Sequence, residues 1–259
     1  MTSQEIDYKT RVKILGVPVS PINLGLAGQI IKSWIDRKEK HYVCVRDVNG
    51  IVECQFDPNY LKIHEEAGLV TPDGMPVVWL TQMKGYKECR RTYGPDLMMH
   101  ICELSLKNEW GHFFYGSSEA VLKDLTNNLK KRFPTLKING FLSPPYRTLT
   151  EAEISAHLEV INHSNSEILW VGLGSPKQEY WMHSSIQKLQ TNVVLGVGAA
   201  FDFHAGHKKQ APVWIQKSGL EWFFRLCTEP KRLAKRYIVR VPLFLVLLFL
   251  HSLGLYRKR

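Results

Sequence analysis

A short glycine-rich segment, GLGSP at residues 172–176, has the residue types that bind phosphate or nucleotide groups. An apolar run from Ile168 to Val171 precedes it, and a helical pattern from Lys177 to Leu189 follows. A second apolar run, Val193 to Val197, ends at Gly198. Two buried strands joined by a helix make a βαβ unit, whose strand ends and helix N-termini commonly hold a phosphate or nucleotide. The sequence therefore predicts a nucleotide site here.

A basic segment and an apolar tail follow this unit. The flanking cations are Lys231, Arg232, Lys235, Arg236, Arg240, Arg257, Lys258 and Arg259. Between them Val241 to Leu250 is apolar, and weaker apolar character continues to Tyr256. Sixteen helical residues would span only about 24 Å, less than the roughly 30 Å of a bilayer core. We predict a monotopic anchor lying in the membrane interface, with a buried terminal helix or a dimer contact as the alternative.

The charge balance points to an anionic partner. The chain has 259 residues, 44% of them hydrophobic, with 34 Lys and Arg against 24 Asp and Glu. That size allows one large or two small domains. Because the excess charge brackets an apolar segment, it favours a membrane surface over nucleic acid. The five cysteines are odd in number and lack a CxxC spacing, so neither a disulfide framework nor a zinc site is predicted. The N-terminus lacks the apolar core of a signal peptide, so we expect no secretion.

Strands and helices are predicted to alternate along the chain, which favours an α/β fold with a mostly parallel sheet. Besides the two strands above, the predicted strands are Arg11 to Val19 with a turn or bulge at Gly16, Tyr42 to Val45, Gly68 to Thr71, His112 to Tyr115 and Ile138 to Leu142. The other predicted helices are Leu24 to Lys38 after a cap at Asn23, a broken helix over residues 50–67, Pro76 to Met83, one from near Leu97, one from residues 117–119, and Glu151 to Ser164.

Several further segments stand in a specific order and spacing. They are TPDGMPVVW at 71–79, RTYGPDL at 91–97, VGLGSPKQEYW at 171–181, VGAAFDFHAG at 197–206, Ala211, Pro212 and Trp214, and GLEWFFRLCTEPKRLAKRY at 219–237. In this order they resemble the bacterial WecG/TagA/CpsF glycosyltransferases, glycosyltransferase family 26, from about residue 12 to about residue 238. The resemblance implies an inverting enzyme that moves a sugar from a UDP-sugar to a saccharide on undecaprenyl diphosphate, without a metal ion or other cofactor.

The pattern and the resemblance together predict how the chain is organised. Residues 1–218 would form a Rossmann-like catalytic domain with flanking helices. Residues 219–259 would form a basic helical appendage whose apolar tail associates with the membrane. The expected partners are a UDP-sugar donor, a polyprenyl-diphosphate-linked sugar acceptor and an anionic membrane surface, with a homo-oligomer left open and no nucleic acid. The expected location is the cytoplasmic face of the bacterial inner membrane, as a peripheral protein.

Two residues fall where the family places its catalytic groups. The resemblance implies that Asp73 is the general base, since an acceptor hydroxyl must lose a proton as it attacks. Without the resemblance, the tripeptide Pro72-Asp73-Gly74 is also a good β-turn. The resemblance likewise implies that Arg91 holds a diphosphate by paired hydrogen bonds and offsets the charge of the leaving group.

Other residues are expected to bind substrate. Gln178 would bond a sugar hydroxyl or a phosphate, while Glu179 would bind substrate or pair near its helix start. Asp202, just after a strand end, would bind ribose or base, or tie down its own loop. Asp47 stands where the family usually has Asn, with Asn49 two residues further on, so contacts at that point are open.

Three arginines, Arg225, Arg232 and Arg236, are spaced to share one helical face, although Pro230 interrupts that helix. The resemblance implies that they reach the diphosphates; the alternative is a basic surface that attracts anionic lipid. The scattered histidines do not form a helix-spaced pair with a carboxylate, so no metal site is predicted.

The donor sugar and the polymer pathway stay open. The amino-acid sequence of residues 71–79 and 91–97 is closer to family members that make exopolysaccharide and capsule than to those that make teichoic acid. Glucose, N-acetylmannosamine and a uronic acid therefore stay open as donor sugars. The alternative function is a non-catalytic membrane-surface protein that binds nucleotide sugar or lipid diphosphate. A nucleic-acid binder ranks third, because the sequence lacks its signatures.

Overall fold

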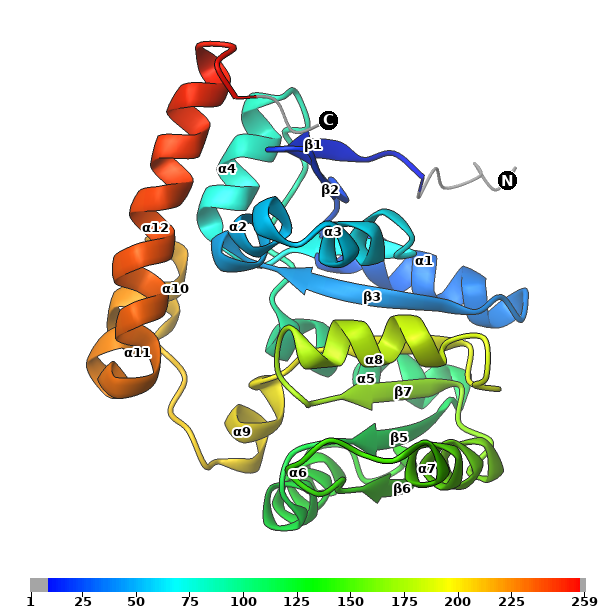
Figure 1. The fold of residues 1–259 in the computed structure, drawn as a ribbon. Helices are drawn as coiled ribbons and strands as arrows, with labels where there is room; N and C mark the ends of the chain where they lie inside the picture. The colour runs from blue at the N-terminus through cyan, green and yellow to red at the C-terminus, as the bar shows by residue number, and fades with distance from the viewer. Residues whose placement is uncertain (1–8, 257–259) are drawn as a thin grey trace.

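The computed structural model describes residues 9–256, except for the side chains of Lys217, Arg232, Lys235 and Arg236. Its centre is a six-stranded sheet in the order β4-β3-β8-β7-β5-β6, in which every neighbouring pair is parallel (Figure 1). The strands are β3 (His41–Arg46), β4 (Leu69–Pro72), β5 (Gly111–Tyr115), β6 (Lys137–Leu142), β7 (Ile168–Val171) and β8 (Val193–Gly196). This confirms the predicted α/β fold with a mostly parallel sheet.

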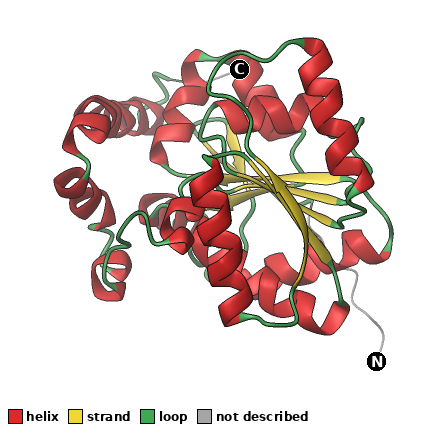
Figure 2. Ribbon diagram, turned by 90° about the horizontal axis from the view of Figure 1, so that it is seen from below, coloured by secondary structure: helices red, strands yellow, loops and turns green. Residues whose placement is uncertain are grey.

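Helices cover both faces of the sheet (Figure 2). One face packs against α1 (Leu24–Asp36), α5 (Gly94–Asn108), α6 (Glu119–Arg132) and α9 (Ala200–Ala205). The other packs against α2 (Val48–Phe56), α3 (Pro58–Glu65), α7 (Glu151–His163) and α8 (Lys177–Ser185). Every residue of β7 and β8 is therefore buried, which explains why both strands are unbroken apolar runs in the sequence.

The N-terminal strand predicted over Arg11 to Val19 is a hairpin of two short strands. The strands β1 (Val12–Ile14) and β2 (Val17–Val19) pair antiparallel outside the main sheet. Leu15 and Gly16 join them with φ angles of 49° and 82°. Two positive φ angles in a two-residue loop match the twist of the flanking strands, so the turn predicted at Gly16 reverses the chain.

Aspartates start the two helices that follow β3. Asp47 caps α2, because its side chain accepts a hydrogen bond from the Gly50 N–H at 3.0 Å. Asp57 caps α3 and accepts from the Tyr60 N–H at 3.0 Å. The predicted broken helix is thus two capped helices that meet at Asp57, and the first begins before residue 50. As a result, Asp47 lies at the carboxyl end of the sheet.

The C-terminal part consists of α10 (Val213–Lys217), α11 (Glu221–Thr228) and α12 (Pro230–Ser252), which follow α9 along one side of the sheet (Figure 1). Glu229 separates the last two with non-helical angles, φ −133° and ψ 55°. The interruption predicted at Pro230 is therefore confirmed, and α11 and α12 take separate directions.

One face of α12 packs along α2, and the opposite face is exposed. Phe244 is buried, Arg240 pairs with Glu53 at 2.6 Å, and the Tyr256 hydroxyl donates to Gln55 Oε1 at 3.0 Å. The exposed apolar side chains of the helix include Ile238, Val239, Leu245, Val246 and Phe249. The tail is therefore an amphipathic helix held on the protein. Among residues 9–256, no helix is long and apolar enough to cross a membrane.

Candidate functional site

Three cavities lie at the carboxyl ends of the parallel strands, the edge at which α/β proteins bind ligands. The large cavity, of about 780 Å³, adjoins the ends of β5, β6 and β7. The central cavity, of about 160 Å³, adjoins the ends of β3, β4 and β8. The lateral cavity, also of about 160 Å³, lies between α4 (Met75–Met83) and helices α10, α11 and α12.

The cavities form a row, because neighbours share wall residues. Gly174, Gly198 and Ala199 line both the large and the central cavity. Asp47, Asn49, Asp73 and Arg225 line both the central and the lateral cavity. A ligand extended along the row would therefore reach from the glycine-rich turn after β7 to the C-terminal helices.

Asp73 lies where the central and lateral cavities meet, directly after β4. Its N–H donates to the Arg46 carbonyl at 2.9 Å, which fixes the backbone at the end of β3. Its side chain is 22% exposed. Burial, opposed by the charge of Arg91 and assisted by that of Asp47, raises the pKa of Asp73 to about 6. A carboxyl group with a pKa near neutrality can take up and release a proton under physiological conditions, as a general base requires.

Arg91 holds the backbone of Asp73 more closely than its carboxylate. Arg91 Nε donates to the Asp73 carbonyl oxygen at 2.6 Å, whereas Nη2 lies 3.4 Å from Asp73 Oδ1. The same Nη2 lies 2.6 Å from Glu221, and Nη1 lies 3.3 Å from Gln216 Oε1. Burial disfavours the charge of Arg91, but Asp73 and Glu221 outweigh it and raise its pKa. The guanidinium therefore joins the turn after β4 to α10 and α11.

Glu221 and Tyr93 belong to the site although no role was predicted for either. Glu221 begins α11 and is buried against Arg91. The Tyr93 ring lies 3.9 Å from the Arg91 guanidinium, and its hydroxyl reaches the wall of the central cavity. Both residues stand inside segments that carry the resemblance, so the signal was present in the sequence. Their contacts with Arg91 depend on the folded chain, and spacing alone did not reveal them.

Asp47 and Asn49, predicted to bind substrate, line the central and lateral cavities. One carboxylate oxygen of Asp47 is committed to the cap of α2. The structure therefore brings both residues to the site and gives Asp47 a structural contact as well. Their role toward substrate stays a prediction.

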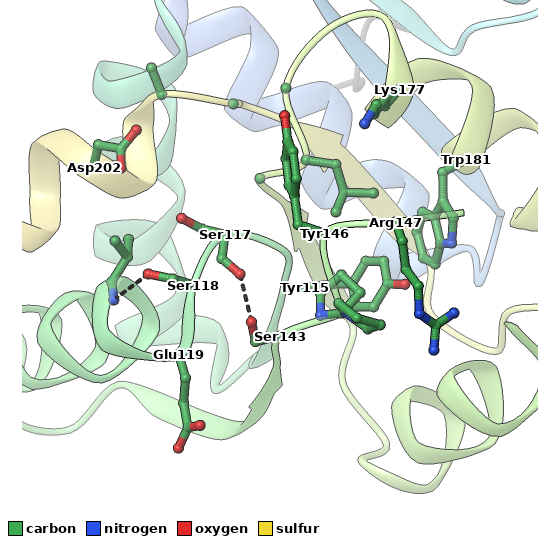
Figure 3. A pocket seen from close by; sticks show the side chains of 18 of the residues that line it. Tyr115, Ser117, Ser118, Glu119, Ser143, Tyr146, Arg147, Lys177, Trp181 and Asp202 are labelled. Carbon is green, nitrogen blue, oxygen red and sulfur yellow. Dashed lines mark hydrogen bonds between the residues drawn. The ribbon is translucent and has the colours of Figure 1, made fainter. Parts of the chain in front are cut away.

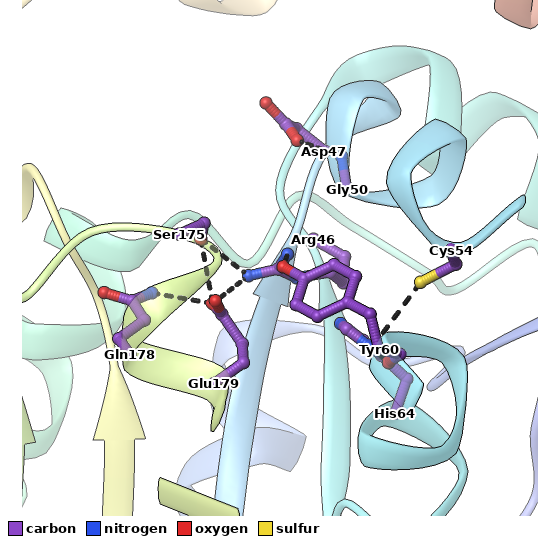
Figure 4. Close-up of polar contacts among 9 residues, drawn as sticks. All are labelled: Arg46, Asp47, Gly50, Cys54, Tyr60, His64, Ser175, Gln178 and Glu179. Carbon is purple, nitrogen blue, oxygen red and sulfur yellow. Dashed lines mark hydrogen bonds and ion pairs between the residues drawn. The ribbon is translucent and has the colours of Figure 1, made fainter. Parts of the chain in front are cut away.

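Gln178 and Glu179 are adjacent in sequence but differ in position. Gln178 lines the central cavity, whereas Glu179 is completely buried beneath it (Figure 4). Glu179 Oε1 accepts hydrogen bonds from Arg46 Nη2, from the Ser175 hydroxyl at 2.9 Å and from Gln178 Nε2 at 2.9 Å. These contacts match the alternative prediction that Glu179 pairs near its helix start, and its contact with substrate stays a prediction. Arg46, which sequence reasoning left without a role, is 2% exposed and lies at the centre of this cluster.

Four residues that line the central cavity carry a buried polar atom without a hydrogen-bond partner among the described residues. The atoms are Arg46 Nε, the Tyr93 hydroxyl, Gln178 Oε1 and Arg225 Nε. Buried polar atoms in proteins are almost always paired, because an unpaired one forfeits its bonds to water. These four atoms are therefore candidates for contact with a ligand in the central cavity.

Of the three predicted arginines, Arg225 reaches this row. It stands on α11 and lines the central and lateral cavities, with its guanidinium 5.8 Å from the Phe203 ring. The backbones of Arg232 and Arg236 belong to α12, and their side chains lie outside the part of the chain that the structure describes. Their predicted contacts with diphosphate stay predictions.

Asp202 lies at the other end of the row and lines the large cavity (Figure 3). Its carboxylate is 3.1 Å from Lys208 Nζ, and its carbonyl accepts from the His207 N–H at 2.9 Å. The residue therefore ties down its loop, as one of the two predictions has it, and also lines a cavity; its contact with ribose or base stays a prediction. Tyr146 is 97% exposed across this cavity.

The large cavity combines aromatic surface, a cation and a helix N-terminus. Lys177 Nζ lies 4.8 Å from the Tyr146 ring, and Trp181 stacks on Tyr115 with their centroids 4.5 Å apart. Ser118 caps α6 and accepts from the Val121 N–H. Aromatic faces bind flat bases, and helix N-termini favour anions. The arrangement suits a nucleotide. Among the described residues no group of three or more His, Cys, Asp or Glu is arranged to hold a metal ion.

The sequence matches a known family over nearly its whole length. Residues 12–258 match the Glycosyl transferase WecG/TagA/CpsF family. The chain therefore belongs to this family and is a glycosyltransferase. The resemblance noted from the motifs is confirmed.

Two curated relatives that match most of the chain carry the same name. A protein of Bacillus subtilis strain 168 is 28% identical over 221 residues, 81% of this chain and 83% of that protein. A Staphylococcus aureus protein from strain NCTC 8325 is 23% identical over 250 residues, 95% of this chain and 94% of that protein. Both are named N-acetylglucosaminyldiphosphoundecaprenol N-acetyl-beta-D-mannosaminyltransferase.

Proposed function

We propose that this chain transfers a sugar from a UDP-sugar to an undecaprenyl-diphosphate-linked saccharide, with inversion, in the synthesis of bacterial exopolysaccharide, capsule or cell-wall polymer. The observation that carries the proposal is the position of Asp73, with its pKa near 6, between two cavities that different substrates can occupy. Family membership supports the reaction class.

The row of cavities suggests how the two substrates meet. The nucleotide would occupy the large cavity, beside Asp202 and Tyr146, and the donor sugar the central cavity. Gly174 and Gly198, which line both, would let the diphosphate pass close to the backbone. The acceptor saccharide would enter from the lateral cavity, so that its hydroxyl reaches Asp73.

In this arrangement the reaction is one displacement. Asp73 takes the proton of the acceptor hydroxyl while that oxygen forms a bond to the anomeric carbon. The bond from that carbon to the β-phosphate oxygen breaks, and UDP leaves with the bonding electrons. Attack from the face opposite the leaving group inverts the anomeric carbon. Arg225 would stabilise charge on the departing diphosphate, and Arg91 would hold Asp73 in place.

The lateral cavity suits a lipid-linked acceptor, because its wall changes character along its length. Asp73 and Arg91 lie at one end, while Trp222, Phe244 and Leu245 form apolar wall on the side of α11 and α12. We propose that residues 219–259 act as a membrane-associating appendage at the cytoplasmic face of the inner membrane.

Exposed aromatic side chains on α10 and α11 support this location, among them Trp214, which is 68% exposed. We expect Trp214→Ser to weaken binding to vesicles containing anionic lipid about tenfold, from the lost apolar burial. Val160→Ser, an exposed site on α7, is the matched control. Equal binding of the two variants would count against this membrane face.

The relatives' names make N-acetylmannosamine the first donor to test, with N-acetylglucosamine on undecaprenyl diphosphate as acceptor. Glucose and a uronic acid, which the sequence left open, complete the panel. UDP release would be followed with each UDP-sugar, a short-chain polyprenyl-diphosphate-sugar acceptor, and either EDTA or Mg²⁺. We expect acceptor-dependent release that survives EDTA. Binding of UDP-sugars without transfer across the acceptor panel would favour the non-catalytic binding protein instead.

A further inference from the structure

The side-chain amide of Gln178 has a defined orientation. Gln178 is 3% exposed, and its Nε2 donates to Glu179 Oε1 at 2.9 Å (Figure 4). A carboxylate only accepts hydrogen bonds, so the reversed amide would place two acceptor oxygens in contact. The NH₂ group must therefore face Glu179. The carbonyl oxygen, Oε1, points away from it and is buried without a partner among the described residues.

Glu179 is itself fixed by a buried cation. Arg46 Nη2 donates to the carboxylate oxygen that receives Gln178, and Arg46 Nη1 donates to the Tyr60 hydroxyl. The pair is almost wholly buried, with Arg46 2% and Glu179 0% exposed. A Cβ at Gly50 would lie 2.6 Å from Arg46 Nη1, so the chain leaves room for this side chain where α2 begins. Separating such a pair leaves an uncompensated buried charge, which opposes any rotation of Glu179.

The free oxygen of Gln178 faces the donor side of the site. A Cβ built on Gly198 would lie 3.4 Å from Gln178 Oε1, and Gly198 lines both the large and the central cavity. Gln178 lines the central cavity and is absent from the wall of the lateral cavity. In the arrangement proposed above, a group in contact with this oxygen belongs to the donor sugar.

We infer that Gln178 presents its carbonyl oxygen, Oε1, to the donor sugar and accepts a hydrogen bond from a hydroxyl or acetamido N–H of that sugar. Arg46 and Glu179 are the positioning residues that fix this orientation. A phosphate at neutral pH offers only acceptor oxygens, so Gln178 Oε1 would repel one placed against it. Of the two partners predicted for Gln178 from the sequence, this orientation of the amide favours the sugar over the phosphate. The inference rests on the proposed function, because it assumes a UDP-sugar in the row of cavities.

The first test separates sugar from diphosphate. Dissociation constants for UDP, UDP-N-acetylmannosamine and UDP-glucose would be measured for the wild type and for Gln178→Met, which keeps side-chain length and leaves the Arg46–Glu179 pair intact. We expect the affinity of the variant for UDP to stay within about twofold and its affinity for the UDP-sugar that the wild type transfers to fall about three- to tenfold. An equal loss for UDP would overturn the inference, because it would place Gln178 on the diphosphate.

A ligand series locates the group that Gln178 selects without further change to the protein. UDP-sugar analogues would each lack one hydroxyl or the acetamido group. The analogue that lacks the group bound by Gln178 should bind the wild type more weakly than the parent UDP-sugar does. The same analogue should bind Gln178→Met no more weakly than the parent UDP-sugar does. If every analogue shows the same loss in both proteins, no sugar donor meets Gln178 and the inference fails.

Glu179→Gln tests the positioning role, because an amide at position 179 no longer dictates which way Gln178 turns. We expect the ratio of UDP-sugar affinity to UDP affinity to fall as in Gln178→Met. A merely structural role would lower both affinities together with the melting temperature and leave the ratio unchanged. Should Glu179→Gln not fold, the two preceding measurements still decide the inference. If the wild type binds neither UDP nor any UDP-sugar, the proposed function itself is overturned. If the wild type transfers sugar and the variants keep its ratio of UDP-sugar affinity to UDP affinity, only the inference is overturned.

Discussion

Two arginine–carboxylate pairs stand at the ends of β3 and β4, and they differ in burial and in how closely the arginine contacts the carboxylate. In the pair of Arg46 with Glu179, both side chains are at most 2% exposed and one carboxylate oxygen receives three donors. In the pair of Arg91 with Asp73, the side chains are 16% and 22% exposed and the closest carboxylate contact is 3.4 Å. The first pair is closed to solvent, although Arg46 adjoins the central cavity, and Asp73 of the second pair is open to two cavities.

The difference follows from what else each arginine holds. Arg46 directs its charge at Glu179, whereas Arg91 shares its charge with Glu221 at 2.6 Å. Asp73 is thus buried beside a cation that compensates it incompletely, and its pKa rises to about 6. A carboxylate that is held directly by its cation serves to position neighbours, while an under-compensated one can take up a proton. Similar residue types at neighbouring strand ends therefore support two different roles.

The largest effect should come from removing the open carboxylate. We expect Asp73→Asn to lower the transfer rate about 10²- to 10⁴-fold, the usual contribution of a positioned base. A group whose pKa is higher in the folded state than its unfolded value, here 3.8, contributes stability below that value and loses it as the pH rises through about 6. At pH 7 the variant should thus be more stable, on the order of 1–3 kcal/mol, in urea unfolding. Full activity, or a clear loss of stability, would contradict the role given to Asp73.

The second effect compares the arginines. Arg46→Met leaves Glu179 buried without a cation, and we expect it to cost about 3–5 kcal/mol of unfolding free energy. Arg91→Met should cost less, because Asp73 and Glu221 are 22% and 10% exposed whereas Glu179 is 0% exposed. For the same loss of stability, however, Arg91→Met should lower the transfer rate more than Arg46→Met does. Equal destabilisation by the two changes would remove the distinction between a closed and an open pair.

A smaller effect should follow from Glu221→Gln, which removes the carboxylate that competes with Asp73 for Arg91. The charge of Glu221 helps to raise the pKa of Asp73, so the variant should have a lower pKa at that carboxyl. The acidic limb of the rate profile should then move to lower pH. Glu153→Gln, on the far helix α7, is the control and should leave the limb in place. A limb that stays or moves upward in Glu221→Gln would show that Glu221 does not act on Asp73.

Much of the sheet was predictable from the sequence, because its strands are buried on both faces and read as plain apolar runs. The bounds of β7 were predicted as found, and those of β8 within one residue. The hairpin at residues 12–19 was read as one strand, since a two-residue turn barely interrupts the apolar pattern. In the C-terminal helix α12, the apolar run alone does not show which face is covered by the rest of the protein. In the structure Phe244 and Leu247 lie on the covered face.

The site was predictable in part. Asp73, Arg91, Gln178 and Asp202 were singled out through the motifs, and the structure brings them to one row of cavities. Arg46 escaped notice because a charged residue at a strand end suggests exposure, and its partner Glu179 stands 133 residues away. Contacts between residues so far apart in the sequence form only in the folded chain, and the local spacing of residues does not predict them.

The most direct measurement is the pH dependence of the transfer rate of the wild type under saturating donor and acceptor, between pH 4.5 and 8.5. If Asp73 is the base, the rate should reach a plateau above neutrality and fall about tenfold per pH unit below an apparent pKa of about 6. The residual rate of Asp73→Asn should lack this limb. A flat wild-type profile across the range, or the same limb in both proteins, would contradict the assignment of Asp73 as the general base.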